Sequence, residues 1–265
     1  MTPKHNDPTI SLIAAQYARA NTPWYIGYSG GKDSSAVLKL LYMALAGLSR
    51  KSTRITIVYA DSGVEMPPVR DLALSVLTAY QAECTAHGIP LSIAVVSPPL
   101  GDRYLVKVIG RGYPPPTNKF RWCTRRLRTN PVNRFFRDAG AESGILLLGL
   151  RKGESATRDR TIARYSSPNH NYLRQDRERG LLIFAPIIDY STEEVWATLL
   201  ENPIPRSIDA EALFALYKDA SHEDSMIQQP SSPPYGRGRF GCWTCTVVRK
   251  DRALTSLVSN GYPAL

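Results

Sequence analysis

The chain has 265 residues, of which 43% are hydrophobic, and a formal net charge of +10, so it can bury the core of one large domain. No stretch approaches the roughly 18 apolar residues of a membrane span, and the first residues lack the apolar segment of a secretory signal. Four cysteines are too few for a disulfide framework. We therefore expect a cytoplasmic protein with no membrane partner.

Strands and helices alternate along the first two hundred residues. Apolar runs predict strands over 24–28, 54–59, 91–96 and 145–148. Helical spacing predicts a helix over 34–46 that stops at Gly47, and Pro67 and Pro68 open a second helix that runs to His87. This alternation predicts an α/β fold, a parallel sheet with helices on both faces.

A change of pattern follows residue 201. Ser191 and Glu194 form a capping box for a helix to about Leu200, which the segment 202–205 with its two prolines ends. We place a domain boundary there, between 1–201 and 202–265. The second part is predicted to be small and mainly helical, with a helix over 209–220, a poorly structured stretch over 228–239, a cysteine pair and a last short helix.

The segment Ser29-Gly30-Gly31-Lys32-Asp33-Ser34 lies between the first strand and its helix. Glycines allow close backbone approach, and the free amides at a helix start bind phosphate. This is not the common P-loop, because Ile26 and Asp33 occupy positions where that motif needs glycine and Ser or Thr. Asp61 and Arg151 also directly follow strands, so we expect them to meet this loop in one crevice.

The loop resembles the pyrophosphatase loop of the adenine nucleotide alpha-hydrolase superfamily, whose members cleave ATP between the alpha and beta phosphates. Segments 59–67, 148–158 and 184–191 resemble further motifs of its phosphoadenosine phosphosulfate reductase branch. The resemblance implies ATP and Mg²⁺ as cofactors, and it implies catalytic roles for Lys32, Asp33, Asp61, Arg151 and Cys123. The nucleotide-binding residues that it implies are Ser29, Gly30, Gly31, Lys32, Asp33, Ser34, Asp61, Arg151 and Arg158. For Glu65 and Glu154 a functional role and a helix cap or ion pair remain equally open.

Three cysteines stand in two further motifs, Cys123 in one and the pair Cys242 and Cys245 in the other. Thiolate-rich sites favour soft metals or iron-sulfur clusters. The two segments, with 112–114, 116–117 and 148–151, resemble the ATP-dependent sulfurtransferase of DNA phosphorothioation in the Dnd and Ssp systems. That resemblance implies a [4Fe-4S] cluster with four cysteine ligands, but Tyr235 stands where the fourth is expected.

Three outcomes for these cysteines remain open. Cys123, Cys242 and Cys245 hold the cluster and leave one iron open, or Cys84 supplies a fourth thiolate, or no cluster forms and the cysteines carry a persulfide or a disulfide. We expect the first. Cys84 is better explained as a small buried hydrophobe in a helix.

Positive charge is concentrated between Lys119 and Arg179, where fifteen Lys or Arg face six Asp or Glu. Such a field attracts polyanions, nucleic acid first among them, although a solvated basic face is the plain alternative. We expect Arg151 and Arg158 to serve ATP. The other cations around Cys123 and after Arg158 would then form a track for a DNA backbone: Lys119, Arg121, Arg125, Arg126, Arg128, Arg160 and Arg164.

The expected function is that of an ATP pyrophosphatase that activates a DNA backbone phosphate for sulfur incorporation. Its expected partners are DNA, a cysteine desulfurase as sulfur donor and other phosphorothioation proteins. Three alternatives are a sulfonucleotide reductase, a tRNA-thiolating sulfurtransferase and a nucleic-acid-binding module with zinc on the cysteine pair.

Overall fold

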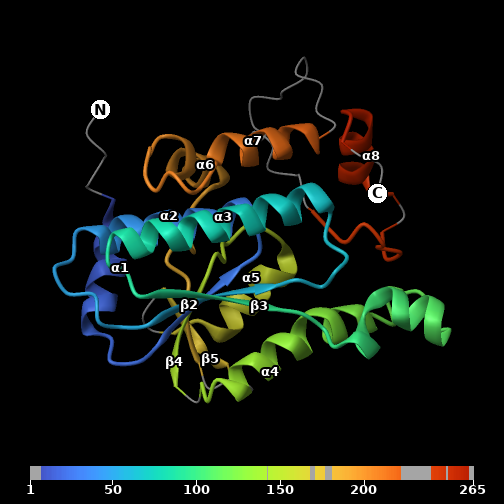
Figure 1. Cartoon of the computed structure of the whole chain (residues 1–265), viewed down its shortest axis with the longest axis horizontal. Helices are drawn as coiled ribbons and strands as arrows, with labels where there is room; N and C mark the ends of the chain where they lie inside the picture. The colour runs from blue at the N-terminus through green and yellow to red at the C-terminus, as the bar shows by residue number, and fades with distance from the viewer. Residues whose placement is uncertain are drawn as a thin grey trace.

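A six-stranded sheet forms the centre of the computed structural model, which describes residues 7–141, 143–167, 171–176, 181–221, 240–248 and 250–262 (Figure 1). The strand order is β3-β2-β1-β4-β6-β5. All neighbours pair in parallel except β5, which runs antiparallel to β6. The strands are β1 Trp24–Tyr28, β2 Ile55–Ala60, β3 Leu91–Val96, β4 Gly144–Leu148, β5 Tyr172–Asp176 and β6 Leu181–Phe184.

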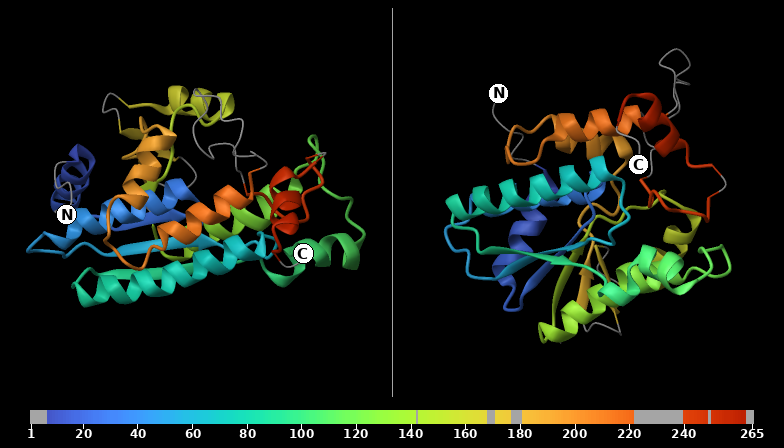
Figure 2. Two further views of the ribbon diagram at one scale, coloured as in Figure 1. Left: turned by 90° about the horizontal axis from the view of Figure 1, so that it is seen from above. Right: turned by 45° about the vertical axis from the view of Figure 1, so that its right-hand side comes forward.

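Helices cover both faces of this sheet, as predicted. Successive side chains of a strand point to opposite faces, so Trp24 and Ile26 of β1 enter the main core while Tyr25 packs against Phe136 on the other side. The main-core face carries α1 Pro8–Arg19, α2 Lys32–Ala46, α3 Pro67–Ala86, α6 Thr192–Leu200 and α7 Ala210–Asp219. The opposite face carries α4 Asn130–Asp138. Figure 2 shows the helices from two further sides.

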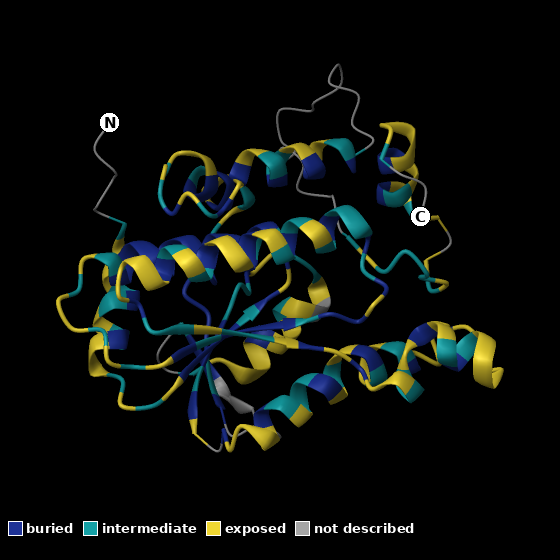
Figure 3. Ribbon diagram, in the orientation of Figure 1, coloured by how far each residue is buried: buried dark blue, intermediate teal, exposed yellow. Residues whose placement is uncertain are grey.

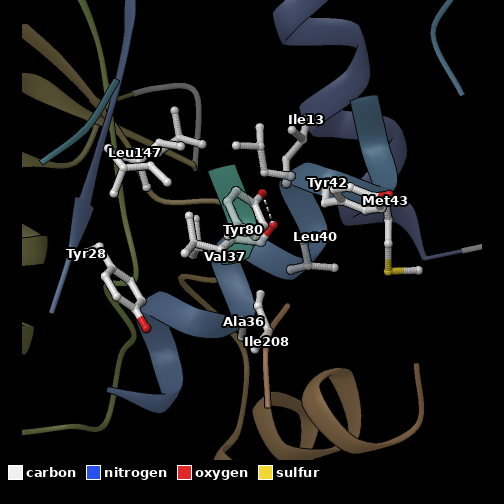
Figure 4. Close-up of a cluster of buried hydrophobic side chains, with 14 of the residues drawn as sticks. Ile13, Tyr28, Ala36, Val37, Leu40, Tyr42, Met43, Tyr80, Leu147 and Ile208 are labelled. Carbon is white, nitrogen blue, oxygen red and sulfur yellow. Dashed lines mark hydrogen bonds between the residues drawn. The ribbon is translucent and has the colours of Figure 1, made fainter. Parts of the chain in front are cut away.

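The main core is built around α2, which is buried along almost its whole length (Figures 3 and 4). Val37 and Leu40 pack with Ile13 of α1 in this core, and the Tyr80 hydroxyl of α3 donates to the Leu38 carbonyl oxygen at 2.7 Å. A helix that is apolar on most sides is typical of a position between two layers. The predicted helix over 34–46 is confirmed and begins two residues earlier, at Lys32.

The C-terminal region packs onto the same core. Ile208 and Leu213 join the main cluster, and α8 Arg252–Ser259 packs against α7 through Leu257. The capping box of α6 is present, with Ser191 and Glu194 bonded to each other's backbone amides. The boundary at 201/202 stays a prediction, and residues 222–239, with most of the stretch predicted to be poorly structured, lie outside the described residues.

Several elements were not predicted from the sequence. These are α1, α4, the edge strand β5, α5 Ala156–Tyr165 and the π-helical turns Val106–Gly110 and Thr124–Thr129. In the described part of the chain, no helix combines the length and the apolar character that crossing a bilayer requires.

Lys39 of α2 makes stability depend on pH. Its side chain is 2% exposed and Nζ donates to the Leu199 carbonyl oxygen at the end of α6, at 2.5 Å. Burial lowers its pKa from 10.5 to about 8, so between these values the unfolded chain binds a proton that the folded chain does not. The contribution of Lys39 to the free energy of unfolding should therefore rise with pH across this window, by about 3 kcal/mol in all.

Urea denaturation at pH 7.5 and pH 10 tests this prediction. Relative to the wild type, Lys39→Met should lose this contribution, because the variant has no group at this position that titrates there. Lys51→Met, in the loop before β2, should keep it. An equal change with pH in both variants would show that Lys39 does not make this contribution.

Candidate functional site

A cleft of about 980 Å³ opens at the carboxyl ends of β1 and β4, where ligands bind in open α/β sheets. The Ser29 loop, Arg151 and Arg158 all line it, as do Glu65 and Arg128 from other parts of the chain. Further lining residues come from the loops after β4 and β6, from α7 and from the C-terminal segment: Gly149, Lys152, Gly153, Glu154, Tyr190, Ser191, Thr192, Tyr217, Phe240 and Gly241.

The loop between β1 and α2 is a tight turn held by serine hydroxyls. Gly30 has a φ of +74°, and a Cβ there would lie 2.7 Å from the Ala73 Cβ, so glycine is required. The Ser34 hydroxyl contacts the Ser29 hydroxyl at 3.1 Å and donates to the Gly31 carbonyl oxygen at 3.0 Å. The turn therefore presents the first amides of α2 to the cleft, the usual arrangement of an anion site.

A buried ion pair joins the loop to the end of β4. The Arg151 Nε donates to the Asp33 Oδ1 at 2.5 Å, while the Lys32 Nζ lies 3.1 Å from the Asp33 Oδ2. Arg151 is 5% exposed and also donates to the Tyr190 carbonyl oxygen at 3.0 Å. Gly149 makes this approach possible, because a Cβ there would lie 2.8 Å from the Asp33 backbone carbonyl. One carboxylate thus neutralises part of the charge of two cations in the cleft.

Asp33→Asn should destabilise the protein by about 3 kcal/mol, because it leaves the buried Arg151 guanidinium without its counter-charge. Urea denaturation measures the change. The control is Asp138→Asn, whose partner Arg137 is exposed, and it should stay within about 0.5 kcal/mol of the wild type. Equal effects of the two variants would contradict a structural role for the buried pair.

Arg158 and Asp61 already have partners in the same chain. Arg158 lines the cleft and pairs with Glu154 at the start of α5. The Asp61 Oδ2 accepts from the Arg70 Nη2 at 2.9 Å and Oδ1 accepts from the Gly63 amide at 2.9 Å. Burial opposes ionisation of Asp61, yet these hydrogen bonds outweigh it and hold its pKa below the usual value. Asp61 follows β2 but is not among the described residues that line the cleft.

Glu65, whose role the sequence leaves open, does face the cleft. Its Oε1 accepts from the Ser62 hydroxyl at 2.5 Å and lies 3.4 Å from the Arg128 Nη2. Its Oε2 is buried and has no hydrogen-bond partner among the described residues. A buried oxygen without a donor needs an explanation, and a carboxylate oxygen is a ligand that Mg²⁺ prefers. Glu65 therefore fits a bound Mg²⁺ better than the paired Asp33 and Asp61 do.

The C-terminal cysteine segment attaches to the loop after β2. Glu65 and Cys242 form an isolated antiparallel bridge, and the Trp243 amide donates to the Val64 carbonyl oxygen at 3.1 Å. The Arg128 Nη2 lies 3.7 Å from the Cys242 Sγ. Burial raises the pKa of the Cys242 thiol, while Arg128 acts in the opposite direction.

The three cysteines of the two motifs lie around one aromatic cluster. Cys123 and Cys242 pack against Tyr104 and Trp122, whose rings are stacked with centroids 5.8 Å apart. Burial raises the pKa of Tyr104, and nearby Cys123, Cys245 and Cys242 add to the effect. Within the described ranges, however, no three His, Cys, Asp or Glu side chains are close enough to hold a metal ion. The cysteines are gathered, but they do not form a closed ligand set.

Cys84, the candidate for a fourth ligand, does not join this group. Cys84 is 0% exposed in the main core beside Tyr80, and its burial raises the pKa of the thiol to about 12. This placement agrees with the expectation that Cys84 is a small buried hydrophobe. Tyr235 lies outside the described residues.

The sequence did not indicate Tyr217 as a site residue, yet its hydroxyl accepts a hydrogen bond from the Lys32 amide at 3.3 Å. In the sequence Tyr217 is only one apolar position of a helix, and no local signal shows that this helix faces the loop after β1. Phe240, which also lines the cleft, packs edge-on against the Tyr217 ring at 4.7 Å.

The parallel sheet, the reversal of strand order between β1 and β4 and the free amides at the start of α2 are typical of nucleotide-binding α/β proteins. The chain belongs to the phosphoadenosine phosphosulfate reductase domain family, whose model matches residues 23–248.

Two curated relatives are similar to parts of the chain. An adenosine 5'-phosphosulfate reductase from Neisseria meningitidis serogroup B is 37% identical over 85 residues, which are 32% of this chain and 29% of the relative. An uncharacterized protein from Methanocaldococcus jannaschii is 24% identical over 196 residues, which are 74% of this chain and 35% of the relative. The chain thus spans about a third of the length of these relatives.

Solved structures with a similar fold include two enzymes. The phosphoadenylyl-sulfate reductase from Candida auris matches with a TM-score of 0.46 and 13% identity, over 74% of this chain and 80% of its own. The U34-tRNA thiolase NcsA from Methanococcus maripaludis, solved with its [4Fe-4S] cluster, matches with a TM-score of 0.46 and 17% identity, over 97% of this chain and 74% of its own.

Proposed function

We propose that this protein is an ATP pyrophosphatase that activates a DNA backbone phosphate for the incorporation of sulfur. One observation carries the proposal: a single cleft extends from the Ser29 loop to Arg128 and Gly241, the residue before Cys242. A nucleotide bound at the loop would therefore lie in the same space as the sulfur-bearing segment.

The first step is the transfer of the adenylyl group. A non-bridging oxygen of the DNA phosphate forms a bond to the alpha phosphorus, and the bond from that phosphorus to the oxygen of the beta phosphate breaks. The amides at the start of α2 and the Lys32 ammonium stabilise the charge on the departing pyrophosphate. Glu65 would hold Mg²⁺, which when bound supplies further positive charge to the phosphates.

The second step places sulfur on the activated phosphate. A persulfide on Cys242, loaded by a cysteine desulfurase, attacks the phosphorus of the adenylylated DNA phosphate, and AMP leaves. The Cys245 thiolate then attacks the sulfur of Cys242, so that a Cys242–Cys245 disulfide forms and the phosphorothioate is released. A dithiol reductant restores the two thiols. The Cys245 amide donates to the Cys242 carbonyl oxygen at 2.9 Å, a tight turn that keeps the two residues close.

A [4Fe-4S] cluster with Cys123, Cys242 and Cys245 as ligands is the alternative use of these thiols, because cysteines bound to iron cannot also carry the persulfide and form the disulfide. The shared aromatic cluster around Tyr104 supports it, whereas the lack of a closed ligand set among the described residues does not. Anaerobic purification with analysis of iron and acid-labile sulfide tests it. A colourless, iron-free protein that is still active would exclude the cluster.

Exposed cations beside the cleft support a nucleic-acid substrate. Lys119, Arg121 and Arg125 are exposed, on the segment that leads from the first π-helical turn to α4 at the right of Figure 1. Arg126 is already paired with Asp102 at 2.9 Å, so it contributes less to this surface. Contacts of such residues to phosphates would be largely independent of sequence and sensitive to salt.

Pyrophosphate release from ATP, measured without polymer, with DNA and with tRNA, tests the proposed function. Stimulation by DNA, with sulfur appearing in the DNA when a desulfurase and other phosphorothioation proteins are added, is the expected result. Stimulation by tRNA alone would instead assign the protein to tRNA thiolation. No pyrophosphate release under any condition would contradict both assignments.

Sulfonucleotide reduction is the second candidate, favoured by the 37% identity with adenosine 5'-phosphosulfate reductase over 85 residues. A sulfonucleotide would occupy the same cleft, and a cysteine thiolate would attack its sulfur. Sulfite release from adenosine 5'-phosphosulfate or its 3'-phosphorylated form, with a thiol donor and without ATP, would identify this activity.

A further inference from the structure

Helix α7 brings the hydroxyl group of Tyr217 to the Ser29 loop. Tyr217 is 5% exposed and its OH accepts from the Lys32 amide at 3.3 Å. A Cβ on Gly31 would lie 3.2 Å from the same hydroxyl. The absence of a side chain at Gly31 therefore leaves room for both the turn of the loop and this contact.

The Tyr217 ring is held rigidly in this position. Trp196 of α6 packs edge-on against it at a centroid distance of 5.3 Å, and Phe240 does so at 4.7 Å. The Lys32 Nζ lies 5.4 Å from the centre of the ring. A hydroxyl fixed in this way loses little side-chain entropy when a ligand binds to it.

The Tyr217 hydroxyl still has a proton to donate. It uses a lone pair to accept from the Lys32 amide, and none of the described residues accepts its own proton. Burial raises the pKa of Tyr217 well above its ordinary value, so the proton stays on the oxygen. A hydroxyl that accepts a hydrogen bond from a helix N-terminus is polarised and becomes a better donor.

We propose that Tyr217 is a phosphate-binding residue. Its hydroxyl accepts a hydrogen bond from the Lys32 amide and donates one to a phosphate oxygen in the cleft. The ligand class is a nucleoside triphosphate or the pyrophosphate released from it, so the inference rests on the proposed function. The C-terminal region would thereby contribute a phosphate-binding group to the anion site, in addition to packing against the core.

If Tyr217 does not bind phosphate, removal of its hydroxyl is expected to change the affinity in the opposite direction. If Tyr217 only covers the Lys32 amide, the hydroxyl competes with phosphate for that donor. Removing the hydroxyl would then free the amide and strengthen phosphate binding. The sign of the change in affinity therefore separates the two roles.

Titration calorimetry of the full chain with inorganic pyrophosphate is the test. Tyr217→Phe keeps the ring and removes the hydroxyl, and it should weaken pyrophosphate binding about 10- to 100-fold, the effect of one lost hydrogen bond to a charged group. Tyr80→Phe is the matched control, because its hydroxyl bonds to Leu38 in the main core, and its affinity should equal that of the wild type. Thermal unfolding confirms that both variants are folded.

The comparison with Lys32→Ala separates this inference from the proposed function. Binding that is lost in Lys32→Ala but unchanged or tighter in Tyr217→Phe would overturn the role of Tyr217 and leave the loop assignment standing. Wild-type protein that binds neither pyrophosphate nor ATP would overturn the proposed function, and the role of Tyr217 with it.

Discussion

Lys32→Ala should lower the rate of pyrophosphate release from ATP by at least about 100-fold, the loss typical of removing one donor that stabilises developing charge. The Lys32 side chain is 8% exposed at the first residue of α2, and its ammonium now pairs with the Asp33 Oδ2 at 3.1 Å. An incoming triphosphate offers more negative charge than this carboxylate does. The ammonium should therefore turn to the phosphates when ATP binds.

Pyrophosphate release measured at saturating ATP separates a slower reaction from weaker binding. Lys51→Ala removes a lysine outside the cleft and should release pyrophosphate at the wild-type rate. Asp33 keeps Arg151 as its partner in Lys32→Ala, so the variant should stay folded. A wild-type rate in Lys32→Ala would show that the loop is not the site of ATP cleavage.

Cys242→Ser should abolish sulfur incorporation and leave pyrophosphate release largely intact. The proposed persulfide forms on this thiol, and the hydroxyl of serine cannot carry it. Arg128, which lies 3.7 Å from the Cys242 Sγ, also lines the cleft. The sulfur would therefore lie close to the activated phosphate, although the loop that is proposed to bind ATP is made by other residues.

Labelled sulfur supplied through a cysteine desulfurase measures the transfer, and pyrophosphate release is followed in the same samples. Cys84→Ala is the control, since Cys84 lies in the main core, and it should retain both activities. Wild-type sulfur transfer by Cys242→Ser would assign the sulfur to another cysteine. Loss of both activities would indicate that this segment supports the cleft and does not carry sulfur.

The local signals of the sequence were sufficient for strands β1 to β4 and for the turn of the Ser29 loop. The apolar run of β1, the glycine pair and the capping box of α6 each depend on neighbouring residues, and all are present in the structure. Helix α1 carries the same kind of signal, because Ile10, Ile13 and Tyr17 follow helical spacing on its buried face. It could have been predicted. Strand β5 could not, because its short, polar sequence resembles that of a loop.

Most of the remaining site depends on contacts between distant parts of the chain. The bridge between Glu65 and Cys242 and the contact of Tyr217 with Lys32 join segments that no local pattern relates. For Asp61, the sequence likewise could not reveal a contact with another part of the chain. Its position after β2 predicted a role at the nucleotide, but only the structure shows that Arg70 already binds its carboxylate.

The shared carboxylate of Asp33 has a consequence for which anions the cleft accepts. Lys32 and Arg151 are both paired with this carboxylate, which shields the two cations from each other in the cleft. An incoming anion must interact more strongly with either cation than the Asp33 carboxylate does before it can displace that carboxylate. A singly charged metabolite would gain too little interaction free energy from this exchange, whereas a polyphosphate would gain enough. Asp33 would therefore make the cleft selective for anions with several negative charges.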